Sequence, residues 1–153
     1  MRDFTFDLYK KFLNKLILLG YEFMTFSAFI QMQDNNRKKI VIRHDVDKKI
    51  ENALKVAKLE NDLGIKSSFY FRYTKVVFKP EIIKRISYLG HEVGYHYEIL
   101  SKIQGDMKKG IELFKKELSD FRKISDTKTI CMHGSPLSKW DNRKLWEKYD
   151  YQD

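Results

Sequence analysis

Short apolar runs alternate with longer amphipathic segments along this chain, and that order restricts the fold more than any other feature. The short runs have the length of buried strands and span residues 38–43, 67–71, 92–95 and 129–132. The first contains Ile40, Val41 and Ile42, a β-branched series typical of a strand that is buried on both faces. Strands that alternate with helices are expected to lie parallel and to be joined by right-handed helical crossovers.

Apolar residues at helical spacing predict helices over residues 5–19, 50–63, 80–89 and 107–121. Ser138 and Asp141 form a capping-box pattern, which predicts a last helix through Leu145 and Tyr149. Residues 21–33 are rich in aromatic side chains and fit no single element. We therefore expect an α/β fold in which the parallel strands form either an open doubly wound sheet or part of a (β/α) barrel.

Composition limits the class of protein further. The 153 residues fit one domain, 1–153, and 42% hydrophobic with 33% charged residues is typical of a soluble globular protein. No apolar stretch is long enough to cross a bilayer and no secretory signal is visible, so we expect a cytoplasmic protein without a membrane span. Because Cys131 is the only cysteine, an internal disulfide and a cysteine-rich zinc finger are both excluded.

The formal net charge of +9 raises the question of a nucleic-acid partner. The basic residues are scattered over different predicted elements and form no block of like charge. Solvated helix faces explain this distribution, and nucleic-acid binding is the less favoured interpretation.

Polar side chains follow the ends of all four predicted strands. They are Asp45, Asp47, Arg72, His96, Glu98 and His133. Because active sites of parallel α/β folds are built at the C-terminal ends of the strands, we expect these side chains to converge on one rim.

The residue types indicate metal chemistry. Asp45 and Asp47 are two residues apart, so both carboxylates point the same way if the chain is extended, and they repel each other unless a cation compensates. With an imidazole from His96 and one further ligand, a divalent ion would have the donors typical of catalytic zinc and keep a position for water. Zinc lowers the pKa of bound water to about 7, and the second carboxylate could accept the proton.

Structural roles compete with these assignments. Asp47 is placed equally well to cap the helix that runs to residue 63. Arg72 could pair with a carboxylate, and that pairing could orient Asp45. Structural roles are also expected for three further residues. His44 and His91 are interpreted as packed or hydrogen-bonded histidines, and Cys131 as an inert buried thiol.

Three motifs together resemble the polysaccharide deacetylases of the NodB-homology type, carbohydrate esterase family 4, in their divergent WbmS-like group with an His-Asp-Val-Asp motif. The motifs are residues 43–47, residues 90–98, and residues 131–136 with 141–143. The resemblance covers most of the chain from about Tyr21 onward. It implies a distorted (β/α) barrel and metal-dependent removal of acetyl groups from a sugar or a surface polysaccharide.

The resemblance also implies roles for single residues. Asp45 matches the catalytic base, Asp47 takes the part of the metal-binding aspartate, and His96 matches the first metal-binding histidine. The second metal-binding histidine of the family would fall at Leu100, so Glu98 and His133 are equal alternatives for the third ligand. His133 could also serve as general acid or substrate contact. Side chains expected to contact the sugar are Arg72, Tyr73, Tyr97 and Trp140.

Family barrels need more strands than this chain provides, and their late general-acid histidine has no counterpart before Asp153. We therefore expect a truncated remnant, a barrel completed by a partner chain or a second copy, or a half barrel with a reduced role. An incomplete barrel would leave exposed sheet edges and apolar surface, which a partner chain or a second copy could cover. The leading hypothesis is a zinc-dependent carbohydrate deacetylase, and the alternative is a catalytically silent fragment that binds carbohydrate.

Overall fold

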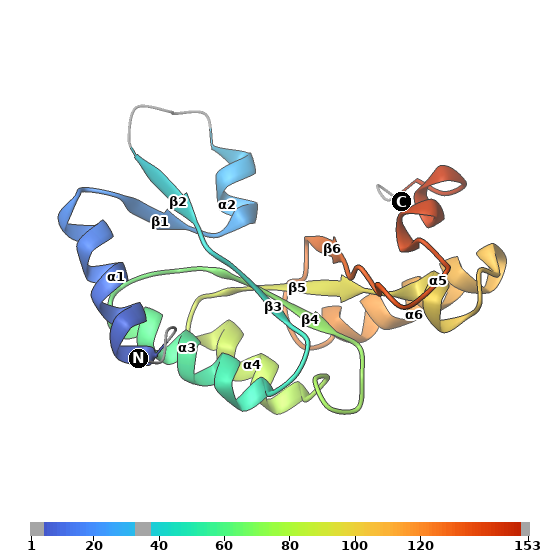
Figure 1. Ribbon diagram of the computed structural model, residues 1–153, viewed down its shortest axis with the longest axis horizontal. Coiled ribbons are helices and arrows are strands. Elements are labelled where there is room, and N and C mark those ends of the chain that lie inside the picture. Colours follow the sequence, from blue (N-terminus) through green and yellow to red (C-terminus); the bar gives the residue numbers. More distant parts are fainter. Residues whose placement is uncertain (1–4, 33–37, 151–153) are drawn as a thin grey trace.

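Parallel strands form the centre of the fold. The structure is a computed structural model, and it describes residues 5–32 and 38–150. Within these residues the main sheet contains β3 (Arg43–Val46), β4 (Ser68–Arg72), β5 (Glu92–Tyr97) and β6 (Ile130–Met132), all parallel and in sequence order (Figure 1). A doubly wound sheet reverses its strand order at a switch point, whereas a barrel keeps it. The α/β prediction is confirmed, and the sheet is a curled half barrel.

Helices connect these strands as the sequence predicts. They are α3 (Ile50–Asp62), α4 (Pro80–Tyr88) and α6 (Met107–Arg122). Pro80 occupies the first turn of α4, where its missing N–H costs nothing, and the Asp106 carboxylate accepts the Lys109 N–H at the start of α6. Alternate strand residues pack against these helices in a buried core that includes Phe69, Phe71, Val93, Tyr95, Ile83, Ile86, Phe114 and Phe121.

The other set of alternate residues forms a second face of the sheet, which we call the inner face. Strand register places one row of side chains at Asp45, Tyr70 and Gly94 and the next at Arg72, His96 and Cys131. Because side chains alternate between the two faces of a strand, Asp45, Arg72 and His96 belong to this inner face, and Asp47, Glu98 and His133 follow directly after the ends of β3, β5 and β6.

The N-terminal segment adds α1 (Phe6–Leu18), β1 (Glu22–Met24), α2 (Phe26–Gln31) and β2 (Lys39–Val41). The single strand predicted over 38–43 is wrong: it divides at Ile42 into β2, which pairs with β1 in a separate parallel sheet, and β3. The ambiguous segment 21–33 forms β1 and α2, apart from Gln33, which lies outside the described residues. The first backbone amides of α2 donate to Ser68 and Glu92, so this helix lies against the inner face.

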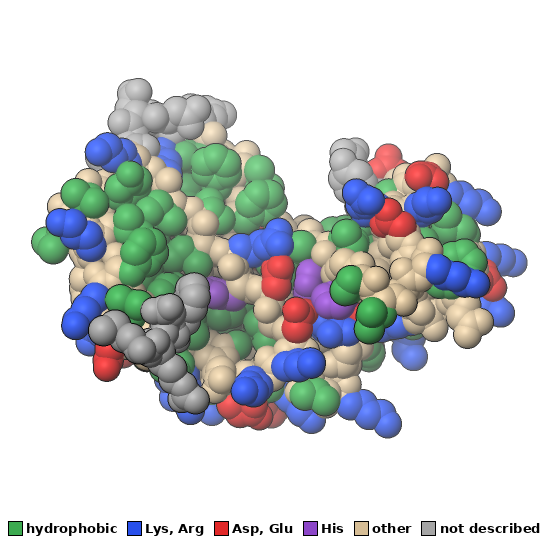
Figure 2. Space-filling model, viewed as in Figure 1, with side chains coloured by type: hydrophobic (Ala, Val, Ile, Leu, Met, Phe, Trp, Pro, Cys, Tyr) green, Lys and Arg blue, Asp and Glu red, His purple; other side chains and the backbone are tan. Residues whose placement is uncertain are grey.

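The apolar stripe of α1 is largely exposed. Only Leu13 is buried, while Leu8, Phe12 and Leu19 are exposed together with Phe26 and Phe29 of α2. Figure 2 shows hydrophobic surface over this part of the molecule. Exposed apolar side chains are therefore present on both α1 and α2.

Two short elements near the C-terminus differ from the prediction. The last helix is a 3-10 helix, η1 (Asn142–Glu147), which ends before Tyr149. Asp141 alone caps it by accepting the Arg143 N–H, whereas Ser138 accepts the Trp140 N–H, so the capping box is wrong. A short helix, α5 (Ile99–Lys102), was not expected. In the described ranges, no helix has both the length and the apolar character needed to span a membrane.

Candidate metal centre

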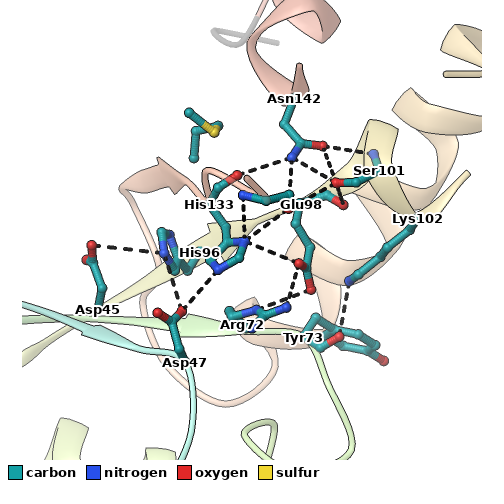
Figure 3. Close-up of polar contacts among 12 residues, drawn as sticks. Asp45, Asp47, Arg72, Tyr73, His96, Glu98, Ser101, Lys102, His133 and Asn142 are labelled. Carbon is teal, nitrogen blue, oxygen red and sulfur yellow. Dashed lines mark hydrogen bonds and ion pairs between the residues drawn. The ribbon is translucent and has the colours of Figure 1, made fainter. Parts of the chain in front are cut away.

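Asp47, His96 and His133 converge at the C-terminal edge of the sheet (Figure 3). Asp47 Oδ1 lies 3.7 Å from His96 Nε2 and 3.6 Å from His133 Nε2. One ligand atom from each of the three residues lies within 4.8 Å of the others, which is close enough for one ion to contact all three. The convergence of these three side chains, which come from three separate elements, is therefore confirmed.

The environment of Asp47 suits a cation. Although 45% of its side chain is exposed, Oδ1 is buried and has no hydrogen-bond partner among the described residues. Both nitrogens near it are beyond hydrogen-bonding distance. A buried carboxylate oxygen without a partner is costly, and a metal ion would compensate it. The alternative role as a helix cap is wrong, because Lys49 is the N-cap residue of α3 and no side chain caps this helix.

Hydrogen bonds orient the His96 ring toward the centre. Its Nδ1 lies 3.0 Å from the Cys131 carbonyl oxygen, to which it can donate, so that Nε2 keeps its lone pair. The ring is 4% exposed. A backbone carbonyl behind the distal nitrogen is a usual arrangement for a metal-binding histidine.

His133 is held between two groups that favour different tautomers. Its Nδ1 lies 3.3 Å from Glu98 Oε2, to which it can donate, and 3.3 Å from the Ser135 backbone nitrogen, from which it can accept. Donation from Nδ1, either to Glu98 or to the Ser135 hydroxyl oxygen at 3.1 Å, leaves Nε2 free to bind metal. Burial, followed by the charge of Arg72, lowers the pKa of His133 below its ordinary value, so the ring is neutral at pH 7.

Glu98 occupies a supporting position. Both of its oxygens accept hydrogen bonds from Arg72, at 2.6 Å from Nη2 and 3.3 Å from Nε. Glu98 belongs to neither group of three metal-ligating side chains that the described residues form. Of the two alternatives for the third ligand, the geometry favours His133. Arg72 does not orient Asp45, whose carboxylate pairs instead with Arg43 at 2.7 Å.

A second group of possible ligands shares His96. Asp45, His96 and Cys131 each offer one atom within 4.8 Å of the other two. Cys131 is half-buried, and burial raises the pKa of its thiol, so it is protonated without metal. The sequence interpretation of an inert buried thiol therefore overlooked its position beside His96 in the β5–β6 register.

A cavity of about 510 Å³ adjoins the centre. Its lining residues are Arg72, Glu98, Ser101, His133, Ser135, Pro136, Leu137 and Ser138. Leu137 is fully exposed at this cavity. The volume falls within the range of small-molecule sites, and the hydroxyl, guanidinium and imidazole groups can hydrogen-bond a polar ligand.

The three aromatic residues expected to contact sugar are absent from this lining. Tyr97 is 4% exposed and its hydroxyl accepts a hydrogen bond from Trp146, which leaves its ring no exposed face for stacking. The Tyr73 hydroxyl donates to Asp120. Trp140 packs so closely on Gly105 that an added Cβ there would lie 2.4 Å from the indole.

Sequence reasoning missed the residues that hold the loop of His133. Asn142, which is buried, donates from Nδ2 to the His133 carbonyl oxygen at 3.1 Å and accepts the Ser101 N–H through Oδ1 at 3.1 Å. Both side chains are polar, so hydrophobic patterning gives no signal for this contact.

Comparison of the chain with protein-family models, curated proteins and solved structures finds no match.

Proposed function

We propose that this chain is a divergent half-barrel relative of the NodB-type polysaccharide deacetylases and removes acetyl groups from a sugar or a polysaccharide. The observation that carries this proposal is the group of Asp47, His96 and His133 around a buried carboxylate oxygen without a partner. Asp47 Oδ1 and the Nε2 atoms of the two histidines would hold the metal, with zinc as the ion that best suits one carboxylate and two imidazoles.

A zinc ion at these donors would activate water at neutral pH and polarise the acetyl carbonyl. The remaining chemistry belongs to side chains of the chain. Asp45 Oδ2 lies 4.0 Å from His96 Nε2, so its carboxylate is beside the donors without being part of their group. Its proposed role is that of general base, which accepts a proton from the attacking water. The same carboxylate also pairs with Arg43 at 2.7 Å.

The adjoining cavity supports a sugar as substrate. Ser101, Ser135 and Ser138 line it together with Arg72, so hydroxyl and guanidinium donors are available for sugar hydroxyls. The exposed side chain of Leu137 supplies an apolar contact. Glu98 keeps Arg72 in place through two hydrogen bonds, which limits the net charge at the cavity and suits a neutral ligand.

Acetate release from N-acetylated and O-acetylated amino sugars, measured with zinc present, tests the proposal. We expect turnover, and we expect Asp45→Asn to lower it by about 100-fold to 10,000-fold, the contribution of a general base. Asp126→Asn is the matched control because Asp126 is 79% exposed and is absent from both groups of ligands. Sugar binding without acetate release would support the catalytically silent alternative instead.

A further inference from the structure

We propose that Cys131 gives the same centre a second, sulfur-containing binding mode for thiophilic divalent cations, and that this mode switches off the deacetylase by engaging Asp45. The ligands of this mode are Asp45, His96 and Cys131. The regulatory half of this inference rests on the proposed function, whereas the binding mode itself does not.

Strand register brings the thiol to the centre. His96 on β5 pairs with Cys131 on β6, so their side chains are neighbours on the inner face. Asp45 on β3 approaches the same imidazole from the other side, with Oδ2 4.0 Å from Nε2. One ligand atom of each residue lies within 4.8 Å of the other two, as in the group that contains Asp47 and His133.

The two groups compete for His96 Nε2, because Nδ1 of the same ring lies 3.0 Å from the Cys131 carbonyl oxygen, to which it can donate. Nε2 lies 3.7 Å from Asp47 Oδ1 and 4.0 Å from Asp45 Oδ2, and it has one lone pair to donate. An ion bound to it therefore takes either Asp47 with His133 or Asp45 with Cys131. Each molecule holds one ion on His96 in one of two positions.

The chemistry of the ion decides between the positions. The first offers a carboxylate and two imidazoles, and the second replaces one imidazole with a thiolate, which softer cations prefer. Binding in the second position breaks the S–H bond of Cys131 and forms a sulfur–metal bond, while the proton leaves to solvent and no electron is transferred. Ions with high affinity for sulfur, such as Cd²⁺, can displace that proton.

Engagement of Asp45 explains why this mode would be inhibitory. In the other mode Asp45 pairs with Arg43, whose side chain is 54% exposed, and exposed ion pairs of this kind are weak. The carboxylate can therefore exchange Arg43 for a metal ion. Once it is a ligand it no longer accepts a proton from water, and the proposed general base is lost.

Ultraviolet titration of the full chain with Cd²⁺, after removal of bound metal, tests the binding mode. A thiolate-to-metal charge-transfer band is unambiguous here because Cys131 is the only cysteine in the chain. We expect this band in the parent, in Asp47→Ala and in His133→Ala, and we expect its loss in Cys131→Ser and Cys131→Ala. Circular dichroism checks that each variant is folded. Cd²⁺ binding to the folded parent without the band would overturn the inference.

Acetate release in the presence of Cd²⁺ tests the regulatory half. We expect Cys131→Ser to need at least tenfold more Cd²⁺ for half inhibition than the parent. Equal inhibition of both would overturn the regulatory role. The two proposals can fail separately. A charge-transfer band without any acetate release would support the binding mode and overturn the deacetylase proposal. Acetate release without the band would support the deacetylase proposal and overturn the binding mode.

Discussion

Asp47 Oδ1 and His96 Nε2 face each other at 3.7 Å, although β4 lies between their strands in the sheet. The parallel arrangement makes this possible because β3, β4 and β5 all end at the same edge. On the intervening strand, Arg72 pairs in register with His96 and turns its guanidinium to Glu98. With His133 added, the centre therefore offers one carboxylate and two imidazoles to an ion, and the neighbouring Arg72–Glu98 ion pair supports them.

Glu98→Gln tests that supporting role. The substitution replaces the charged acceptor of His133 Nδ1 with a neutral carboxamide and leaves the neutral Ser135 hydroxyl at 3.1 Å, so the tautomer with its proton on Nδ1 is less favoured. We expect zinc affinity to fall by about 10-fold to 100-fold, as for other groups that orient a ligand. Calorimetric titration in the Cys131→Ser background measures it without the second binding mode. Unchanged affinity would contradict the role, and complete loss would make Glu98 a ligand.

Gly94→Ala tests the close packing of the inner face. An added Cβ would lie 2.4 Å from two ring atoms of Tyr70, which is buried and donates a hydrogen bond to Thr129. We expect the free energy of unfolding to fall by about 1–3 kcal/mol, the usual cost of overpacking. Gly134→Ala is the matched control, because its added Cβ meets no atom of the described structure within 4 Å. Urea unfolding of both variants measures the difference, and equal stabilities would contradict the tight contact.

Glu60→Ala tests a buried polar cluster that joins α1, β3 and α3. The Glu60 carboxylate is fully buried and accepts hydrogen bonds from Tyr9 at 2.5 Å, His44 at 2.7 Å and Ser67 at 2.5 Å. The sequence interpretation of His44 as a hydrogen-bonded structural residue is thus confirmed.

Loss of this carboxylate removes the acceptor of the buried Ser67 hydroxyl and of the partly buried Tyr9 and His44 side chains. We expect Glu60→Ala to lower the free energy of unfolding by about 3–5 kcal/mol. The exposed Glu112 offers a control in α6, and its replacement by alanine should change stability by less than about 0.5 kcal/mol. Similar losses in both variants, measured by chemical denaturation, would show that the cluster contributes little.

Stability should fall as the pH falls below 6.5, because burial lowers the pKa of His91 from that ordinary value. The His91 ring hydrogen-bonds with Ser67 and the Ala57 carbonyl and lies near Glu60, His44 and Lys66. It stays neutral in the folded chain while the unfolded chain takes up a proton. One proton changes stability by at most about 1.4 kcal/mol per pH unit.

Protonation of Glu60 should lower the stability of the fold over a second, lower pH range. Burial alone would raise the pKa of Glu60, but hydrogen bonds from His44, Ser67 and Tyr9 outweigh it and hold the pKa below the ordinary value of 4.5. Its contribution is present above 4.5 and is lost as the carboxylate becomes protonated. Urea unfolding at a series of pH values should show both losses. His91→Gln should flatten the profile just below pH 6.5, and an unchanged profile would contradict the assignment.

The fold was predictable where apolar residues repeat at a regular spacing over a long continuous segment. Helix α6 and the convergence of Asp47, His96 and His133 follow from apolar spacing and from the common edge of parallel strands. The division of one expected strand at Ile42 depends instead on pairing with β1, a strand of three residues with no clear pattern. Non-local pairing of this kind is not encoded in a short segment.

The choice of ligand was not predictable for a similar reason. Glu98 and His133 are both residue types that bind metal, so the sequence does not distinguish them. In the structure both Glu98 oxygens accept hydrogen bonds from Arg72, which belongs to another strand. Cys131 could have been found, since it lies two residues before His133 and shares its face of the strand. Its apolar neighbours Ile130 and Met132 favoured the interpretation of Cys131 as one more buried apolar residue.

Zinc titration by calorimetry tests the central claim, that Asp47 and His96 share one ion. The parent for this comparison is Cys131→Ser, in which only the carboxylate and histidine ligands remain. We expect it to bind one zinc ion, and we expect added Asp47→Ala or His96→Ala to weaken binding by more than about 100-fold, beyond the cost of losing an orienting group. Zinc affinities of both variants equal to that of the parent would contradict the account.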